Sequence, residues 1–378
     1  MIRSLFDIIK EEGRRFFKDS GAMLIMIVGV IAYSIFYMFP YSTEIIRDVP
    51  IGVIDMDNSN LSREYVRNLN ATDSINVVSR YNGVIQAEKD FYSNNIRAFI
   101  LIPKNFGRDI LRGRSVDVAF YGDSGYLIIY KTVYSAVVQT SAYLGAKVEI
   151  GKLLKKGVPM QMAKTLKQPF EFVQTPLYNP AGGYATYIYP VILVLILHQT
   201  LLIGVGLMQG TKNELKEEYC KQNEYLPRVL FGKATFYVML YLFYSIFYFL
   251  IYPAFLAYPM SYNILPLIIM LTIMFYCVVF FSLAISYLFK QRETSLLLLV
   301  VTSLIFIFLP GLIWPKEAIP QLINLIALFI PAICSVDGIV KINQMGATFW
   351  DIRYDVVWLI LLCILYFRIA VSVIKRDD

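Results

Sequence analysis

The sequence is poor in the residues that most enzymes use for chemistry. It has one histidine, His198, and four cysteines that lie far apart, so it offers neither a Cys-X-X-Cys pair nor the spaced ligands of a zinc site. It contains no Gly-X-X-X-X-Gly-Lys-Ser/Thr motif and no Gly-X-Ser-X-Gly motif, which excludes a phosphate-binding loop and the nucleophile turn of a serine hydrolase. We therefore expect no cofactor, no metal and no catalytic residue in this chain.

Charge is also scarce, and its absence points to a bilayer. Charged residues make up 17% of the chain and hydrophobic residues 57%, a balance too apolar for a soluble protein of 378 residues. The net charge of +7 does not indicate nucleic acid, because the basic residues flank apolar stretches instead of forming one soluble stripe. Six stretches have the length and apolarity of a span: residues 21–39 and, approximately, 184–208, 234–257, 264–289, 295–312 and 356–373.

The first 39 residues predict an interfacial helix followed by an uncleaved span. In residues 1–20, aromatic and aliphatic side chains alternate with five basic ones, a pattern typical of an amphipathic helix on an anionic leaflet. A charged flank that only sets the orientation of the span is the alternative. Residues 21–39 end in bulky side chains and not in a small-residue cleavage site, so we predict an anchor and not a signal peptide.

Residues 40–183 form the one long polar region and predict a small α/β domain. Short apolar runs at 51–54, 75–78, 97–102 and 116–120 are typical of strands, and they alternate with helix-like stretches at 61–69, 84–93 and 106–111. Ser59 or Asn60 is expected to cap the first of these helices. Residues 124–157 turn helical again but are too polar to span.

A proline-rich stretch, residues 314–350, separates the fifth and sixth predicted spans. Its apolar run is too short to cross a bilayer comfortably, so a re-entrant or interfacial hairpin is expected, with Pro310 and Gly311 before it and Pro331 within it.

The distribution of lysine and arginine predicts the orientation. With six spans, the basic amino terminus, the basic loop at 212–233, the loop at 290–292 and the tail at 375–376 all fall on one side, which is the cytosolic side. The predicted fold is thus an all-α six-helix transmembrane domain with an inserted extracytoplasmic α/β domain. The boundaries are 1–20, 21–39, 40–183 and 184–378, and both termini lie in the cytosol of a bacterial cell with the spans in its inner membrane.

Polar residues inside the spans are few. His198 and its neighbour Gln199 are the candidates for an intramembrane polar contact, either with a substrate or proton, or simply between packed helices. Because so few titratable groups lie in the spans, we expect the energy for transport to come from a separate ATPase.

The loop after the second span is the candidate docking site for such a subunit. Its mixed charges fall at helical i,i+4 spacing, and an ordinary solvated loop is the alternative. The candidate residues are Lys212, Glu214, Lys216, Glu217 and Glu218.

Several segments resemble, in order, the type 2 permeases of ATP-binding-cassette (ABC) exporters. These are residues 49–59 with Ser62 and Arg63, residues 98–106, the prolines and glycine at 310–331, and residues 338–347. The resemblance covers nearly the whole chain, but the Glu-X-Gly-Thr pattern common in relatives is missing around residues 214–218.

The resemblance implies a permease that exports a drug-like, lipid or other amphipathic molecule. The implied partners are two cytosolic ATPase subunits, a second permease copy or paralogue, and a periplasmic adaptor protein. Two other hypotheses stay open at this point: a membrane-anchored receptor or scaffold whose outer domain binds a partner, and a secondary transporter, which the missing intramembrane acids disfavour.

Overall fold

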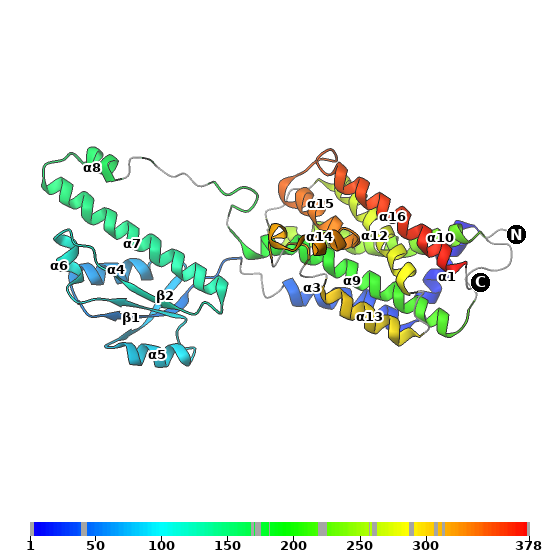
Figure 1. Ribbon diagram of the computed structural model, residues 1–378, viewed down its shortest axis with the longest axis horizontal. Coiled ribbons are helices and arrows are strands. Elements are labelled where there is room, and N and C mark those ends of the chain that lie inside the picture. The colour runs from blue at the N-terminus through cyan, green and yellow to red at the C-terminus, as the bar shows by residue number, and fades with distance from the viewer. Residues whose placement is uncertain are drawn as a thin grey trace. The chain divides into compact units, whose positions relative to one another are not determined.

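The computed structural model describes residues 4–38, 44–167, 170, 175–180, 182–217, 225–256, 258, 263–286, 291–305, 309–311 and 314–375. The chain separates into two compact units, Met1–Glu44 with Pro176–Asp378, and Ile45–Thr175. The first is helical and the second is built on a sheet (Figure 1). We call them the helical unit and the sheet unit.

The helical unit begins with two helices that meet at a sharp bend. Helix α1 is Leu5–Phe16, and the helix that follows, Ser20–Phe36, lies at 89° to it. The second helix consists of α2 (Ser20–Met23), the π-helical segment η1 (Leu24–Gly29) and α3 (Val30–Met38). A right-angle bend is the geometry expected of an interfacial helix followed by a span.

The remaining helices of this unit follow the sheet unit in sequence. They are α9 (Tyr184–Glu214), α10 (Leu226–Ile246), η3 (Phe247–Ile251), α11 (Tyr252–Phe255), α12 (Ile264–Ser286), α13 (Arg292–Ile305), η4 (Lys316–Ala318), α14 (Gln321–Ala327), α15 (Pro331–Met345) and α16 (Arg353–Ile374). Helix α9 is the most buried of them and packs against α3, α12, α13 and α15.

The number of spans is between four and six. Among the described residues, α9, α10 through α11, α12 and α16 are long and apolar enough to cross a membrane, and two bent helix pairs raise the number to six if each pair is one span. The predicted fifth span falls on α13, which has 14 described residues, and residues 306–308 beyond it lie outside the described part of the chain. The multi-pass character is therefore shown, and the arrangement of six spans stays a prediction.

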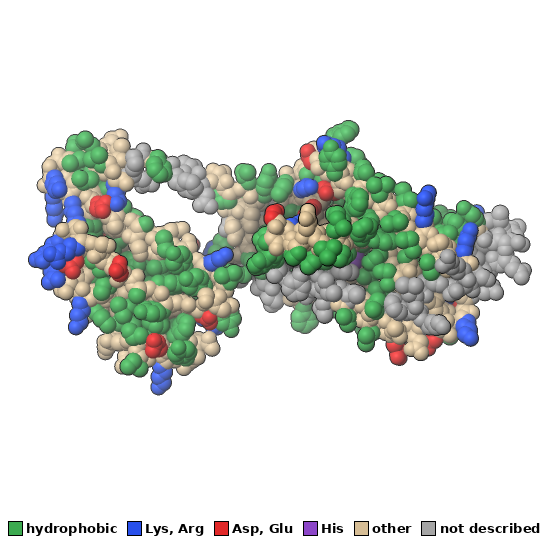
Figure 2. Space-filling view, viewed as in Figure 1, with side chains coloured by type: hydrophobic (Ala, Val, Ile, Leu, Met, Phe, Trp, Pro, Cys, Tyr) green, Lys and Arg blue, Asp and Glu red, His purple; other side chains and the backbone are tan. Residues whose placement is uncertain are grey.

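The outer surface of the helical unit is apolar, as a lipid-facing surface must be. On α16, Val357 and Leu361 are each more than half exposed, and Figure 2 shows hydrophobic side chains over much of the visible face of the unit. In water such a surface would be strongly unfavourable, whereas hydrocarbon tails solvate it.

The sheet unit carries the predicted alternation of strands and helices. Its order is β1 (Val49–Asp55), α4 (Asn60–Asn70), β2 (Ile75–Tyr81), α5 (Val84–Tyr92), β3 (Ala98–Ile102), α6 (Phe106–Leu111), β4 (Ala119–Gly122), α7 (Leu127–Lys155) and α8 (Met160–Lys167). The strands are ordered β2-β1-β3-β4, with β1 parallel to β2 and β3, and β4 antiparallel to β3. The main core lies between one face of the sheet and α4, α6 and α7, and α5 covers a smaller core on the other face.

Local chemistry fixes the beginning of α4 in this unit. Ser59 is the residue that caps the helix, because its hydroxyl accepts a hydrogen bond from the Ser62 amide at 3.1 Å. The fourth strand was predicted at 116–120 but begins only at Ala119, where pairing with β3 starts.

Candidate functional site: a polar cluster between α1, α9 and α10

Helix α1 is built to start sharply and to bury one face. Ser4 and Asp7 form a capping box, in which each side chain accepts a hydrogen bond from the other's backbone amide at 3.1 Å. The buried face carries Ile8, Glu12 and Phe16, each four residues apart, and packs against α10. The buried face of α1, which also includes Gly13, thus presents a carboxylate to its neighbour.

Two glycines bring α1 and α10 unusually close together. A β-carbon on Gly13 would lie 2.9 Å from the Phe236 ring, and one on Gly232 would lie 2.8 Å from the Ile8 side chain. Both distances are shorter than a carbon–carbon contact, so each glycine allows an approach that alanine would block. The helices therefore pack closely at these two positions.

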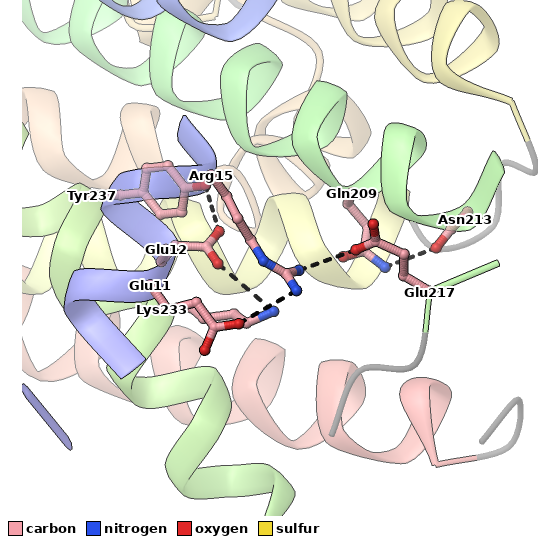
Figure 3. Close-up of polar contacts among 8 residues, drawn as sticks. All are labelled: Glu11, Glu12, Arg15, Gln209, Asn213, Glu217, Lys233 and Tyr237. Carbon is pink, nitrogen blue, oxygen red and sulfur yellow. Dashed lines mark hydrogen bonds and ion pairs between the residues drawn. The ribbon is translucent and has the colours of Figure 1, made fainter. Parts of the chain in front are cut away.

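Glu12 lies inside this contact and is paired there. It is 6% exposed; its Oε1 accepts a hydrogen bond from the Tyr237 hydroxyl at 2.7 Å, and its Oε2 lies 3.7 Å from Lys233 Nζ (Figure 3). A buried carboxylate is tolerated only when it is paired and hydrogen-bonded. Glu12 thus ties α1 to two residues of α10.

Arg15 reaches from α1 to the segment after α9. Its guanidinium lies 3.2 Å from Glu217 and 3.5 Å from Glu11, and beside it the Gln209 side chain donates to Asn213 at 2.9 Å (Figure 3). The Arg15 and Glu217 side chains are 40% and 45% exposed, so water screens this pair and it contributes little to stability. It is a contact that can break and re-form.

Asp19 and Arg292 form the third part of the cluster. The guanidinium donates to both Asp19 carboxylate oxygens, at 2.7 and 2.9 Å, and to the Thr211 hydroxyl at 2.8 Å. Asp19 also caps α2 by accepting from the Ala22 amide at 2.9 Å. This one arginine therefore joins the start of α2, the end of α9 and the start of α13.

The Asp19 carboxyl titrates below its ordinary range. Burial raises its pKa, but the hydrogen bond from Arg292, the hydrogen bond from the Ala22 amide and the positive charge of Arg292 together lower the pKa further than burial raises it. Asp19 is thus held in its charged form, which is the form that Arg292 binds.

A cavity of about 440 Å³ lies among these groups. Glu12, Arg15, Asp19, Lys233 and Arg292 line it, as do Lys18 and Lys212. Lys212 is 7% exposed, so this predicted docking residue faces the cavity and not the solvent.

The other predicted docking residues lie at the end of α9. The helix ends at Glu214, and Lys216 adopts a left-handed conformation with φ at +50°, so the described residues 215–217 do not continue the helix. Glu214 and Lys216 are exposed, Glu217 contacts Arg15, and Glu218 lies outside the described residues.

A groove of about 740 Å³ lies farther along α9, between η1, α3, α9 and α13. Its described lining is apolar or aromatic apart from Gln199 and Thr200, and it contains no charged side chain. The two predicted intramembrane residues therefore have different environments. Gln199 lines the groove, whereas His198 is 1% exposed in the interior of the unit and is not part of the lining.

The predicted hairpin residues lie before and within a second pair of helices that meet at a sharp bend. Helices α14 and α15 meet at 87°, with Pro331 as the first residue of α15. Gly311 has a φ of +85°, a conformation that favours glycine, and Pro310 precedes it as a buried residue. An ion pair between Lys316 and Asp337 at 2.5 Å fastens the segment before α14 to α15.

Sequence reasoning did not single out Glu12, Arg15, Asp19, Lys233 or Arg292 as site residues. A signal for one of them was present, because Glu12 lies four residues after Ile8 and four before Phe16, on the apolar stripe of α1. An acid in that position indicates a partner on the neighbouring element. Nothing in the sequence shows that Arg292, 273 residues after Asp19, binds it.

The helical unit thus has the helices of a multi-pass membrane protein, a polar cluster between α1, α9 and α10, and an open apolar groove bordered by α3, α9 and α13. Residues 21–372 match the family model described as ABC-2 family transporter protein, and the chain belongs to that family. It is a membrane permease of an ABC transporter, which confirms the predicted class, and such permeases are generally non-enzymatic subunits that work with a cytosolic ABC ATPase. No curated protein and no solved structure matches the chain.

The buried carboxylate of Glu12 is expected to hold α1 in place. Glu12→Ala leaves the Tyr237 hydroxyl and Lys233 without it, so we expect the free energy of unfolding to fall by about 1–3 kcal/mol and α1 to loosen. Hydrogen exchange of α1 and thermal unfolding in detergent measure both effects. Glu11→Ala is the matched control, since Glu11 is 36% exposed and its loss should change little. Equal effects of the two substitutions would contradict the assignment.

The lowered pKa of Asp19 predicts a pH dependence with a definite sign. A carboxyl whose pKa is lower when folded stabilises the fold above its unfolded pKa, and this contribution is lost as the pH falls through the folded pKa. The thermal unfolding temperature should therefore drop below about pH 4. Asp19→Asn should be less stable at neutral pH and lack this part of the pH profile. Parallel profiles for the two proteins would refute the prediction.

Proposed function

We propose that this permease exports an amphipathic molecule, drug-like or lipid, from the cytosolic side of a bacterial inner membrane, powered by separate ATPase subunits. The observation that carries the proposal is the polar cluster, which joins the amino-terminal helix to the end of α9 beside the exposed residues Glu214 and Lys216. Family membership supports the need for an ATPase. The direction and the substrate are our inference.

The proposed orientation places the polar cluster on the cytosolic side. Both termini then lie in the cytosol and the sheet unit lies outside, as the lysine and arginine distribution indicates. The first bent pair supports this arrangement, because α1 lies at 89° to the following helix and carries basic residues that suit an anionic leaflet.

The cluster supplies a route for motion from the ATPase into the spans. A force on α1 reaches α10 through Glu12, because that contact is buried and resists separation. The same force reaches α9 and α13 through Asp19 and Arg292. Docking at Glu214 and Lys216 would let an ATPase act on the end of α9 directly.

The groove between η1, α3, α9 and α13 is the proposed surface for the substrate and for a second permease copy or paralogue. An apolar lining binds an amphipathic molecule by burying its apolar part, and an amide such as that of Gln199 orients its polar part. Because α13 and α3 border the groove, the motion that Arg292 transmits would change its width.

The sheet unit is the proposed contact for a periplasmic adaptor protein, which follows from the family resemblance alone. A receptor or scaffold is less well supported, since an anchor does not require a buried ionic cluster at one end of its helices.

Reversing the exposed charges at the end of α9 should uncouple the ATPase. In proteoliposomes that contain the permease and its ATPase, Glu214→Lys with Lys216→Glu should lower permease-dependent ATP hydrolysis and uphill export by about tenfold, because both charges then oppose a complementary surface. Glu317→Lys, an exposed acid next to α14, is the matched control and should leave hydrolysis unchanged.

Unchanged hydrolysis in the double variant would remove the docking assignment. Uphill transport by the permease alone, without any ATPase, would overturn the proposed energy source.

The groove predicts a separate effect of Gln199. Gln199→Leu should slow export of a fluorescent amphipathic cation by about fivefold to tenfold, the effect of one lost hydrogen bond to substrate. Basal hydrolysis should stay near that of the parent protein. Leu361→Ala, on the exposed face of α16, is the control for a general effect of substitution in a span. Equal transport by both variants would exclude the groove from the pathway.

A further inference from the structure

The sheet unit has one strongly basic end. Helix α6 follows the carboxyl end of β3, and α7 begins after the antiparallel strand β4 and runs back along the sheet, so the last turns of both helices lie at the same edge. Lys152 Nζ donates to the Ile110 carbonyl at 2.5 Å, which fixes the end of α7 beside α6. This edge is opposite to the one where the chain enters the sheet at Val49.

Helix α8 extends the same end of the unit. A tight turn at Gly157, with a φ of +83°, closes α7 by hydrogen bonds from the Val158 amide to the Leu153 carbonyl and from the Gly157 amide to the Leu154 carbonyl. The chain then folds back so that α8 packs on α7, with Ala163 fully buried and Lys167 ion-paired with Glu149.

We call the surface formed by the ends of α6, α7 and by α8 the basic face. Its eight basic residues are Arg108, Arg112, Arg114, Lys152, Lys155, Lys156, Lys164 and Lys167, of which all but Lys152 are exposed. Figure 2 shows lysine and arginine side chains gathered at this end of the sheet unit.

Local structural needs do not account for this much charge. Three carboxylates, those of Asp109, Asp117 and Glu149, belong to the same surface, which leaves an excess of five positive charges. The carboxyl ends of α6 and α7 favour nearby cations, but each helix end is equivalent to only roughly half a negative charge. Among the described residues, no acid forms an ion pair with Arg112, Lys155, Lys156 or Lys164.

Large apolar side chains stand among these charges. On α8, Met162 and Leu166 are one turn apart and 57% and 59% exposed, and Met160 is 51% exposed. Exposure of three large apolar side chains to water on one eight-residue helix is unfavourable and indicates a binding surface. Lysine ammonium groups around exposed methionine and leucine side chains are typical of a helix that binds the surface of an anionic bilayer.

We propose that the basic face binds the surface of a bilayer that contains anionic phospholipid, with the lysines and arginines on the headgroups and the α8 side chains among the upper acyl carbons. The face belongs to the sheet unit alone, so the interaction does not depend on the polar cluster or the groove. It would hold this unit against a membrane surface during transport.

The test uses the full chain in nanodiscs of phosphatidylcholine, mixed with separate vesicles and separated by flotation. We expect association with vesicles that contain phosphatidylglycerol, none with vesicles of phosphatidylcholine alone, and loss of association as salt increases. Arg112→Glu with Lys155→Glu and Lys156→Glu should weaken the association at least about tenfold. Met162→Ser with Leu166→Ser should weaken it while leaving its salt dependence unchanged.

The control carries three reversals elsewhere on the sheet unit, Arg47→Glu, Lys89→Glu and Lys131→Glu, all at exposed positions. Equal loss in the two triple variants would show a net-charge effect and overturn the assignment. Binding of poly-glutamate without binding of vesicles would also overturn it, in favour of an acidic protein partner. ATPase stimulation, measured in parallel, should be unchanged by the Arg112 triple variant, so failure here is distinguishable from failure of the proposed function.

Discussion

The buried carboxylate of Glu12 is the constraint on which the mechanics of the helical unit depend. Gly13 and Gly232 let α1 and α10 approach closely, and Glu12, which is only 6% exposed there, must be paired. Tyr237 and Lys233 supply the pairing. Separating the helices would break both of these contacts, so Glu12 opposes the separation of α1 from the start of α10.

The neighbouring ion pair between Arg15 and Glu217 is exposed to solvent, in contrast to the buried Glu12 contact. Arg15 and Glu217 are both largely solvated, so water compensates each charge when the pair opens. This pair therefore holds Glu217 near α1 only weakly. The buried Glu12 contact therefore resists separation more strongly than the solvated Arg15–Glu217 pair beside it.

The sequence allowed much of the fold to be predicted but little of the cluster. Hydrophobic runs and turn residues gave the first three strands and α4 to α6 within a few residues, because those elements bury their own side chains locally. The fourth strand was misplaced because it is defined by pairing with β3, which begins at Ala119. Contacts such as Arg292 with Asp19 join residues far apart in sequence, and periodicity carries no information about them.

Polar residues within the spans show the same limit. His198 and Gln199 are adjacent in sequence, so both were equally good candidates for an intramembrane polar contact. The orientation of α9 about its axis decides that the Gln199 amide lines the groove and the His198 imidazole is buried elsewhere. Along α9, residues 199–203 line the groove and residues 205–212 line the cavity of the cluster. The described lining of the groove has no charged side chain, whereas charged side chains line the cavity of the cluster on the same helix. The groove and the cluster thus share one continuous helix, so a displacement of the cluster end of α9 would also move the side chains that α9 contributes to the groove.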